Sequence, residues 1–235
     1  MQRVSTRAII IIVVAVLCVG GIFSAQADPS RKDTTVAAHQ RIVEWKVEEL
    51  NAAKAEGVSK EGDPRTVDCP YGKAVQFDGT KDGLFLNTNP LEKLKQFTVE
   101  VIFQPDGKAP QEQRFLHMGE VRGDRLLLET RVTDDDRWCL DAFLLSGNSS
   151  QTLIDKNKLH PTGKWYHIAF VVDNGKTNVY VDGQLELDGK IEFSPMKAGA
   201  TSIGVRMNKV SWFKGAIYKV RVTPKSLTPT EFTKS

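Results

Sequence analysis

The sequence predicts an all-β fold, an antiparallel β-sandwich with a short helical turn near the C-terminus. Short segments with alternating or continuous apolar residues recur along the chain, and such segments are typical of strands. Between them stand Asp-Gly or Asn-Gly pairs that favour tight turns, at positions 78–79, 82–83, 174–175, 182–183 and 188–189. Many short strands at this spacing indicate a sandwich.

The N-terminus has the pattern of a secretory signal peptide. Arg3 and Arg7 precede an apolar run over residues 8–23, and small residues follow it. Residues 1–27 are therefore predicted to be removed by cleavage after Ala27. An uncleaved membrane anchor is the alternative, because the run is close to the roughly 17–25 residues that a spanning helix needs. Cleavage predicts an exported protein, whether secreted, periplasmic or held at the cell surface.

Length and charge indicate one domain with no nucleic-acid partner. The chain has 235 residues and a net charge of +3, which falls to +1 when the two signal arginines are removed. A near-neutral chain has no electrostatic attraction for nucleic acid or for an anionic membrane surface. Residues 28–40 are predicted to be a flexible lead-in, and residues 41–235 a single domain. After signal cleavage, no apolar run is long enough to span a membrane.

The first strand is expected within residues 36–56. This stretch is rich in Ala, Glu and Lys and could be helical, but Val43, Trp45 and Val47 alternate with charged residues. The period of two favours an edge or closing strand of the sandwich.

Further strands are expected along the rest of the chain. Apolar residues alternate over residues 97–103 and 126–132, so one face of each segment is predicted to be buried. Residues 165–172 are almost continuously apolar, as in a central strand. A last alternating segment is predicted to have one side formed by Ala216, Tyr218, Val220 and Val222.

Residues 228–231 (TPTE) predict the helical turn near the C-terminus. The segment has a capping threonine, a proline at the first helical position and an acid three residues after the cap. This order is typical of a helix N-terminus.

Five segments in a fixed order carry a family resemblance. They are residues 74–79 (AVQFDG), 97–100 (FTVE), 165–169 (WYHIA), 179–183 (VYVDG) and 215–221 (GAIYKVR). Each alone is weak, because a core aromatic residue and an Asp-Gly turn are general features of β folds. Together they make residues 41–232 resemble laminin G-like domains of the concanavalin A-like lectin/glucanase superfamily.

The resemblance implies a jelly roll of two antiparallel sheets, one of which forms a shallow concave face. In similar domains this face or its rim loops bind carbohydrate or protein, often with a calcium ion, and a minority branch hydrolyses β-glucans. Fold alone does not decide among these functions.

The hydrolase branch carries its carboxylates in line on one strand, as E-x-D-x-E or E-x-D-x-x-E. One acid protonates the leaving oxygen, and another attacks or stabilises. The nearest match here is Glu186, Asp188 and Glu192. Its third acid comes too late, and positions 188–189 are predicted to be a turn that breaks the strand. These residues are therefore not expected to be catalytic.

Two opposed carboxylates are the first candidates for a site. Residues 134–136 are predicted to form a hairpin loop, and the apolar positions on either side set Glu129 opposite Asp141 on the face away from the core. Opposed Cβ atoms lie roughly 4.5–5.5 Å apart, where like charges need compensation, and Arg131 and Arg125 could supply it. The group could be a charge network on a solvated face. It could instead be a patch in which Glu129, Arg131 and Asp141 bind sugar hydroxyls, or a catalytic pair, since retaining glycosidases place their carboxylates about 5–5.5 Å apart.

Loop aspartates are the candidates for a calcium site, because hard cations prefer oxygen ligands. The candidates are Asp78 and Asp82 beside their Asp-Gly turns, and Asp134, Asp135 and Asp136 in the predicted hairpin loop. The alternative for each is a backbone role, because aspartates at turns commonly accept hydrogen bonds from main-chain amides.

Trp212 is a candidate for stacking on a sugar ring, because residues 208–214 (NKVSWFK) are expected to form a loop with exposed aromatic residues. The alternative is packing beneath the loop. Trp138 falls on the apolar side of its strand and is expected in the core. Export makes a disulfide between Cys69 and Cys139 chemically feasible, and two separately buried thiols are the alternative.

The sequence therefore predicts an exported, non-enzymatic module that binds carbohydrate, either as a free glycan or on a glycosylated surface. The first alternative is an interaction or surface-architecture module of the same fold, with a protein ligand. The second is a diverged glycoside hydrolase. Calcium is the cofactor that the resemblance suggests.

Overall fold

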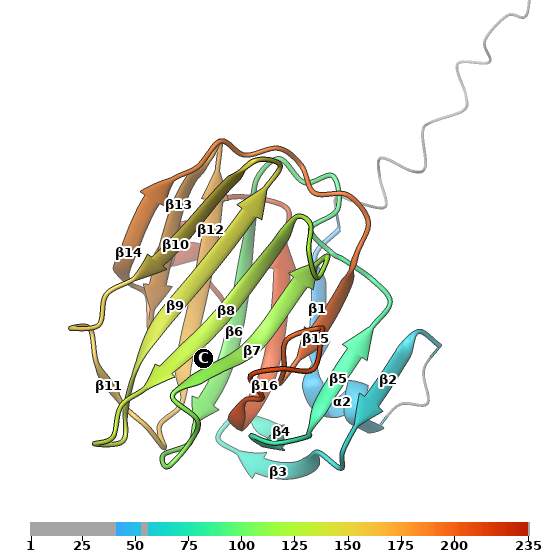
Figure 1. Cartoon of the computed structure of the whole chain (residues 1–235), viewed down its shortest axis with the longest axis vertical. Helices are drawn as coiled ribbons and strands as arrows, with labels where there is room; N and C mark the ends of the chain where they lie inside the picture. Colours follow the sequence, from blue (N-terminus) through green and yellow to red (C-terminus); the bar gives the residue numbers. More distant parts are fainter. Residues whose placement is uncertain (1–40, 53–55, 235) are drawn as a thin grey trace, which may run out of the picture. The chain divides into compact units, whose positions relative to one another are not determined.

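Two antiparallel sheets pack face to face in the computed structural model, which describes residues 41–52 and 56–234 (Figure 1). The front sheet, which faces the reader in Figure 1, has the strand order β10-β9-β8-β7-β15-β5-β2, and β11 pairs with β9. The back sheet has the order β14-β13-β12-β6-β16-β4-β3, and β1 pairs with β16. The predicted all-β sandwich is confirmed.

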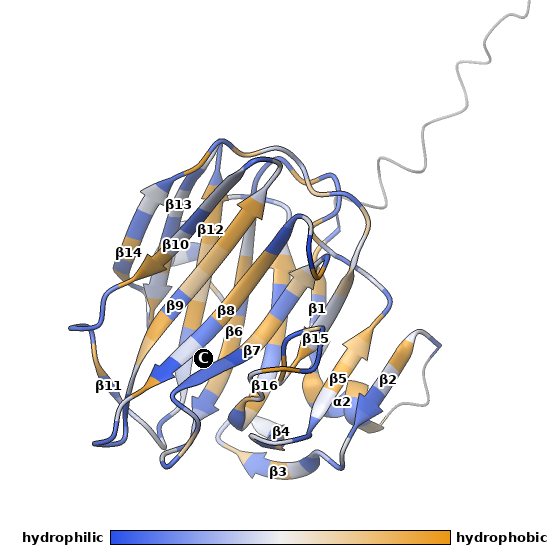
Figure 2. Cartoon of the chain, in the orientation of Figure 1, coloured by the Kyte–Doolittle hydropathy of each residue, from blue (hydrophilic) through white to orange (hydrophobic). Residues whose placement is uncertain are grey.

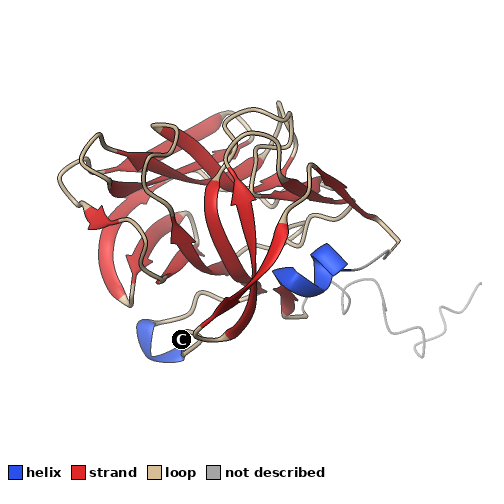
Figure 3. Cartoon of the chain, turned by 90° about the horizontal axis from the view of Figure 1, so that it is seen from below, coloured by secondary structure: helices blue, strands red, loops and turns tan. Residues whose placement is uncertain are grey.

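The front sheet is built from β2 (Val58–Glu61), β5 (Gly83–Leu86), β7 (Glu112–Gly119), β8 (Arg125–Val132), β9 (Arg137–Ser146), β10 (Ser149–Ile154), β11 (His160–Pro161) and β15 (Ala200–Ile203). The back sheet is built from β1 (Val43–Lys46), β3 (Arg65–Cys69), β4 (Gly72–Asp78), β6 (Phe97–Pro105), β12 (Tyr166–Asp173), β13 (Lys176–Val181), β14 (Gln184–Lys190) and β16 (Lys214–Thr223). Two short helical segments, α2 (Val47–Ala52) and η1 (Pro229–Glu231), lie on one side of the sandwich (Figure 3).

Apolar residues on the inner faces of the sheets form the core. Phe97, Val99, Val101 and Phe103 on β6 have no exposed surface, which confirms the alternation predicted for this strand. The front strands β8 and β9 carry long hydrophobic stretches that hydrophilic residues interrupt (Figure 2). β12 pairs with β6 on one side and with β13 on the other, so the continuous apolar run is a central strand, as predicted.

Aromatic side chains join the two sheets at the centre of the core. The Phe103 ring on β6 stacks on Phe115 from β7, with ring centroids 4.5 Å apart. Trp138 on β9 meets Phe103 edge-on at 5.3 Å and is fully buried, which confirms its predicted core position. Phe213 is also fully buried and lies 6.0 Å from Phe103. The prediction that Phe213 is exposed in its loop is therefore wrong.

Two of the predicted tight turns connect consecutive strands as hairpins. Asn174 and Gly175 join β12 to β13 with φ values of 47° and 81°, and Asp182 and Gly183 join β13 to β14 with 49° and 77°. Positive φ at both turn residues is the geometry for which Asn-Gly and Asp-Gly are favoured. The turn predicted at residues 188–189 is wrong, because both residues lie within β14 and pair with β13.

A β-bulge in β16 changes which side chains reach the core. The register against β6 shifts between Ile217 and Lys219, so the two halves of the strand differ in phase. Ile217 and Val220 pack in the core, whereas Tyr218 is half-buried outside it. The single alternating face predicted for this segment is therefore wrong in its first half, because a bulge adds one unpaired residue.

The first described segment is part strand and part helix. Val43–Lys46 forms β1 and pairs with β16, as the alternation predicts. The chain then turns into α2 at Val47, whose side chain is fully buried in the core. The predicted strand therefore ends before Val47, and the Ala- and Glu-rich remainder is helical.

The C-terminal segment packs on the outer face of the back sheet. η1 follows Thr228, whose backbone N–H donates to the Glu231 carboxylate over 2.8 Å, so the predicted helical turn and its capping pattern are confirmed. Phe232 packs against residues of β12 on that face. The backbone N–H of Thr233 donates to Oε1 of the buried Glu100 over 2.6 Å, which fastens the segment to β6.

The predicted signal peptide (residues 1–27) and lead-in (residues 28–40) lie outside the described residues. Within residues 41–52 and 56–234, no helix has the length and apolarity that a bilayer crossing requires.

Candidate functional site

A shallow hollow of about 190 Å³ lies on the outer face of the front sheet. β7, β8, β9 and β10 supply most of its lining, and the loop between β15 and β16 supplies the rest. The lining residues are Arg114, Arg125, Leu127, Glu129, Arg131, Asp141, Phe143, Thr152 and Arg206. The hollow thus combines charged groups with an apolar floor of Leu127 and Phe143.

The register predicted for the two opposed carboxylates is confirmed. β8 and β9 pair so that Leu128 lies opposite Ala142 and Glu129 lies opposite Asp141. Leu128 and Ala142 are fully buried in the core, so the alternation turns both acids to the outer face. Glu129 is nonetheless only 2% exposed and Asp141 3% exposed, because neighbouring side chains cover them.

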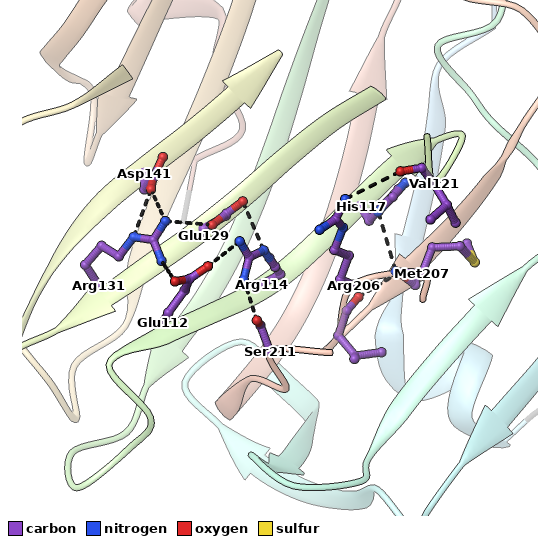
Figure 4. Close-up of polar contacts among 12 residues, drawn as sticks. Glu112, Arg114, His117, Val121, Glu129, Arg131, Asp141, Arg206, Met207 and Ser211 are labelled. Atoms are coloured by element: carbon purple, nitrogen blue, oxygen red, sulfur yellow. Dashed lines mark hydrogen bonds and ion pairs between the residues drawn. The ribbon is translucent and has the colours of Figure 1, made fainter. Parts of the chain in front are cut away.

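Arg131 contacts both acids (Figure 4). Its Nε and Nη2 atoms donate to Oδ2 of Asp141 over 2.9 and 2.5 Å. Nη2 also lies 3.2 Å from Oε2 of Glu129, and Nη1 lies 2.9 Å from Oε2 of Glu112. The predicted compensation by Arg131 is therefore confirmed, and the three acids share one guanidinium.

Arg114 on β7 holds the network from the other side. Its Nε atom lies 3.2 Å from Oε1 of Glu129, and the guanidinium also pairs with Glu112 and with Oγ of Ser211. Sequence reasoning missed Arg114 and Glu112. The pairing of β7 with β8 contains a bulge between Arg114 and Leu116, and simple alternation does not carry through such a bulge.

Burial controls the protonation of Glu129. Removal from water raises the pKa of this carboxyl to about 7, because burial disfavours the charged form. Arg114 acts in the opposite direction, and the nearby Asp141 adds to the rise. Glu129 therefore changes its charge near neutral pH.

Asp141 keeps one acceptor atom without a partner. Its Oδ2 atom receives both N–H groups from Arg131, whereas Oδ1 is buried and has no hydrogen-bond partner among the described residues. An unpaired buried acceptor is uncommon in folded proteins and calls for an explanation, such as a donor that binds there.

The other end of the hollow holds two arginines without carboxylate partners. Arg125 donates to the backbone oxygen of Gly123, and Arg206 donates to that of Val121 (Figure 4). Among residues 41–52 and 56–234, neither forms an ion pair. Arg125 therefore does not contact the two acids and acts on Glu129 only through a longer-range electrostatic interaction. Its guanidinium carbon lies 4.9 Å from the centroid of the Phe143 ring.

Trp212 does not line the hollow. It is half-buried, and its ring packs beside Gly83, where a Cβ would lie 3.3 Å from Cζ3 of the indole. The structure therefore favours packing beneath the loop, which was the alternative for this residue.

The candidate calcium ligands are engaged with the main chain. Oδ1 of Asp78 accepts backbone N–H groups from residues 80–82, and Oδ1 of Asp82 accepts the N–H of Asp63 over 2.8 Å. Asp136 accepts the N–H of Lys108 over 2.6 Å. These contacts fit the backbone role better than a cation cage.

The hairpin aspartates do not converge on one point. Asp135 binds Thr133 and Arg137, while Asp136 turns to residue 108. Asp134 lies in the same loop. Within the part of the chain that the structure describes, no three His, Cys, Asp or Glu side chains gather in a way that could hold a metal ion.

The two cysteines are free thiols in the structure. Cys69 ends β3 in the back sheet and is half-buried, whereas Cys139 is buried on β9 in the front sheet. Of the two alternatives for this pair, the structure thus has separate thiols. Burial raises the pKa of Cys139, so this thiol is poorly ionised and unreactive.

Glu186 and Asp188 lie on β14, in the other sheet from the hollow. Oε1 of Glu186 lies 2.9 Å from Nε2 of His160. Asp188 lies opposite Asn178 on β13. This segment therefore does not join Glu129 and Asp141.

The fold and the hollow together define a class of protein: a two-sheet jelly roll with a polar recess on the outer face of one sheet. Residues 78–232 match the Laminin_G_3 family model, which describes the concanavalin A-like lectin/glucanases superfamily. The match spans more than half of the chain, and the chain belongs to this superfamily. No curated protein matches the chain in sequence.

Solved structures of low sequence identity share the fold. Domain 4 of AbnA, a GH43 extracellular arabinanase from Geobacillus stearothermophilus, was solved in complex with arabinotriose. It aligns with a TM-score of 0.55 at 20% identity, over 82% of this chain and 95% of that one. The botulinum neurotoxin serotype G binding domain aligns at 0.58 and 13% identity, over 74% and 44%. Trypanosoma rangeli sialidase, solved with the inhibitor DANA, aligns at 0.53 and 14% identity, over 74% and 28%.

Proposed function

We propose that this chain is an exported, non-enzymatic module that binds carbohydrate in the hollow on the front sheet. The observation that carries the proposal is the unpaired, buried Oδ1 of Asp141 beside the half-exposed ring of Phe143. A sugar ring offers hydroxyl donors for the first and an apolar C–H face for the part of the Phe143 ring that Arg125 leaves exposed. Binding sites commonly combine an apolar lining with a few well-placed polar groups in this way.

The similar structures support carbohydrate as the ligand class. The arabinanase domain with the same fold was solved with arabinotriose and is covered over nearly its whole length. The complex therefore supports the proposal that a single β-sandwich domain of this length can bind a short oligosaccharide.

The charge network supports binding rather than hydrolysis. In a retaining glycosidase one carboxylate must attack the sugar while the other transfers a proton. Here Asp141 and Glu129 share Arg131, and the two N–H groups on Oδ2 of Asp141 hold its negative charge in an ion pair. Such a carboxylate is a weak nucleophile and a good hydrogen-bond acceptor.

The test is a glycan panel measured by isothermal titration calorimetry with the purified chain and matched variants. Phe143→Ala is expected to weaken binding of the selected glycan about tenfold, which corresponds to ~1.4 kcal/mol. Asp141→Asn is expected to weaken binding as well. The change replaces one carboxylate oxygen by an NH2 group, which cannot accept a hydrogen bond from a sugar hydroxyl. Phe85→Ala is the control, since Phe85 is a half-exposed ring on another front strand outside the hollow. Equal effects of the two Phe→Ala changes, or no binding across the panel, would contradict the proposal.

Calcium dependence is a second arm of the same experiment. We propose that any calcium requirement resides in the loop aspartates 78, 82 and 134–136. Titration of calcium alone, after EDTA treatment, measures such binding directly through heat and a rise in Tm. An unchanged Tm and unchanged glycan affinity would remove calcium from the proposal.

Export rests on the N-terminal pattern and has its own test. Residues 1–27 are expected to be removed when the full chain is expressed with its own N-terminus. N-terminal sequencing of the exported product should then begin at Asp28. A product that keeps Met1 in the membrane fraction would support the anchor alternative.

A further inference from the structure

The Arg125–Arg206 end of the hollow has cationic groups in excess of its acids. Four arginines and two carboxylates line the hollow. Arg114 and Arg131 bind Glu129, Asp141 and the adjacent Glu112. In the described part of the chain no carboxylate forms an ion pair with Arg125 or Arg206, and Glu129 offsets the charge of Arg125 only through a weaker electrostatic interaction.

Hydrogen-bond donors are also left over at this end. A guanidinium carries five N–H donors, and each of these two side chains donates to one backbone oxygen, over 2.8 Å for Arg125 and 3.4 Å for Arg206. The Nε atoms of both are buried and have no partner among the described residues. Buried donors without acceptors are costly, and an acceptor placed between the two side chains would satisfy them.

The two guanidinium groups lie close enough to repel each other. Burial lowers the pKa of Arg125, and the charge of Arg206 lowers it further. His117 on β7 lies beside them and is fully buried, and its Nε2 atom has no partner in the described chain. Burial, together with Arg206 and then Arg125, lowers the pKa of His117 to about 4. The histidine is therefore neutral near pH 7, and the two arginines supply the positive charge.

The geometry points to an anionic subsite: we propose that Arg125 and Arg206 bind a carboxylate or a sulfate group of an acidic glycan. This inference rests on the proposed function, because it names the ligand class for the same hollow. A guanidinium matches the planar carboxylate and the sulfate oxygens with paired N–H donors. Phe143 fixes Arg125 from below through its ring, and Thr152 and Leu127 border the same space.

The first experiment compares charged glycans with their neutral twins by calorimetry at low salt. The pairs are oligogalacturonate with its methyl ester, and a sulfated galactan oligosaccharide with its desulfated form. The charged member of at least one pair is expected to bind about tenfold more tightly, because hydrogen bonds to charged groups are stronger than those to neutral groups. Preference for the first pair assigns the anion to a uronic acid, and preference for the second assigns it to a sulfate ester.

The second experiment removes the two arginines. Arg125→Gln and Arg206→Gln are each expected to abolish the preference for the charged twin, whereas Arg125→Lys keeps part of it through its charge. Arg137→Gln is the control, because Arg137 lies on the exposed hairpin and pairs with Asp135. The Tm of both hollow variants without ligand should stay close to that of the wild type. Each change removes repulsion between the arginines together with one hydrogen bond to a backbone oxygen, and no ion pair is lost.

The outcomes separate this inference from the proposed function. The anionic subsite is overturned if charged and neutral glycans bind with equal affinity, or if both Gln variants keep the full preference for the charged glycan. In either case, binding of the neutral glycan still supports a carbohydrate site. Failure of every glycan to bind refutes both.

Discussion

Arg131 determines whether two nearly buried carboxylates are tolerated on the front sheet. Asp141 and Glu129 lie directly opposite each other, where like charges repel. Arg131 contacts both and reaches Glu112 as well. Its side chain is only 25% exposed, so water screens these contacts less than it screens an ion pair on the open surface.

Arg131→Gln is expected to destabilise the fold by about 3 kcal/mol at pH 8, because it leaves the buried Asp141 without its ion-pair partner and removes one of the two arginines that contact Glu129. Arg137→Gln removes an arginine from an exposed pair with Asp135 and is expected to cost less than about 1 kcal/mol. Urea unfolding of both variants measures the difference. The double change Arg131→Gln with Asp141→Asn should recover part of the loss, since it removes the stranded charge. Similar values for Arg131→Gln and Arg137→Gln would contradict the role given to the network.

Because of the raised pKa of Glu129, the fold is expected to lose stability as pH rises. The pKa of this carboxyl is raised to about 7 in the folded chain from an ordinary 4.5, so folding takes up a proton between these values. Stability from this group is complete below pH 4.5 and is lost as pH rises towards and past 7, by about 3 kcal/mol at full ionisation. In Glu129→Gln this pH-dependent loss of stability should be absent. The variant also lacks the ion pairs of Glu129 with Arg114 and Arg131.

The measurement is the free energy of unfolding of wild type minus that of Glu129→Gln, from pH 4 to pH 9. Taking the difference cancels the opposite effect of His117, whose pKa is lowered to about 4, so that its contribution is lost as pH falls from 6.5. Glu61→Gln is the control, because Glu61 pairs with Lys209 outside the hollow. A difference that is flat with pH would contradict the raised pKa.

Sequence alone could predict one side of the site. Glu129 and Asp141 follow from alternation on two strands and a short hairpin between them, because local periodicity fixes their register. Arg114 is displaced by a bulge, and Arg206 belongs to a loop that has no periodicity. Arg114 reaches Glu129, and Arg206 reaches the hollow, through contacts between residues far apart in the sequence, and no local pattern encodes them.

Turns and bulges set the register of whole strands in this fold. The Asn-Gly and Asp-Gly pairs at 174–175 and 182–183 predicted their hairpins because positive φ is a local requirement. The pair at 188–189 has the same composition but lies in β14, where pairing with β13 decides the conformation. The bulge in β16 has no composition signal either, which explains why the predicted face was wrong there.

Gly175 and Gly183 allow a matched test of these turns. Both have positive φ, at 81° and 77°, so replacement by Ala is strained at either position. A Cβ on Gly175 would lie 2.3 Å from the backbone oxygen of Ile191, whereas none of the neighbours of Gly183 lies within 4 Å. Gly183→Ala is expected to cost about 1–2 kcal/mol from strain alone. Gly175→Ala should cost clearly more, because the main chain at residue 191 has to move. Thermal and urea unfolding of both variants measure the costs, and equal values would contradict the steric argument.

The two sheets depend on one shared core more than on contacts at their edges. The period of two predicted that each strand has a buried face, and this was enough to predict a sandwich. It could not predict that β6 lies between β12 and β16, or that β7 lies between β8 and β15. β12 and β16 are distant in the sequence from β6, and β15 is distant from β7, so no local pattern predicts these pairings.

Phe103 is the residue that tests this shared core. It belongs to the back sheet, yet its ring contacts Phe115 and Trp138 from the front sheet. Phe103→Ala is therefore expected to destabilise the fold by about 4 kcal/mol, since it opens a cavity between the sheets. Leu185→Ala is the control, because Leu185 is 51% exposed and its loss should change stability by less than about 0.5 kcal/mol. Hydrogen exchange followed strand by strand should show faster exchange in β7 and β9 as well as in β6 and β12. Faster exchange confined to the back sheet would mean that the sheets are stabilised independently, and the hollow on the front sheet would then be insensitive to the core beneath it.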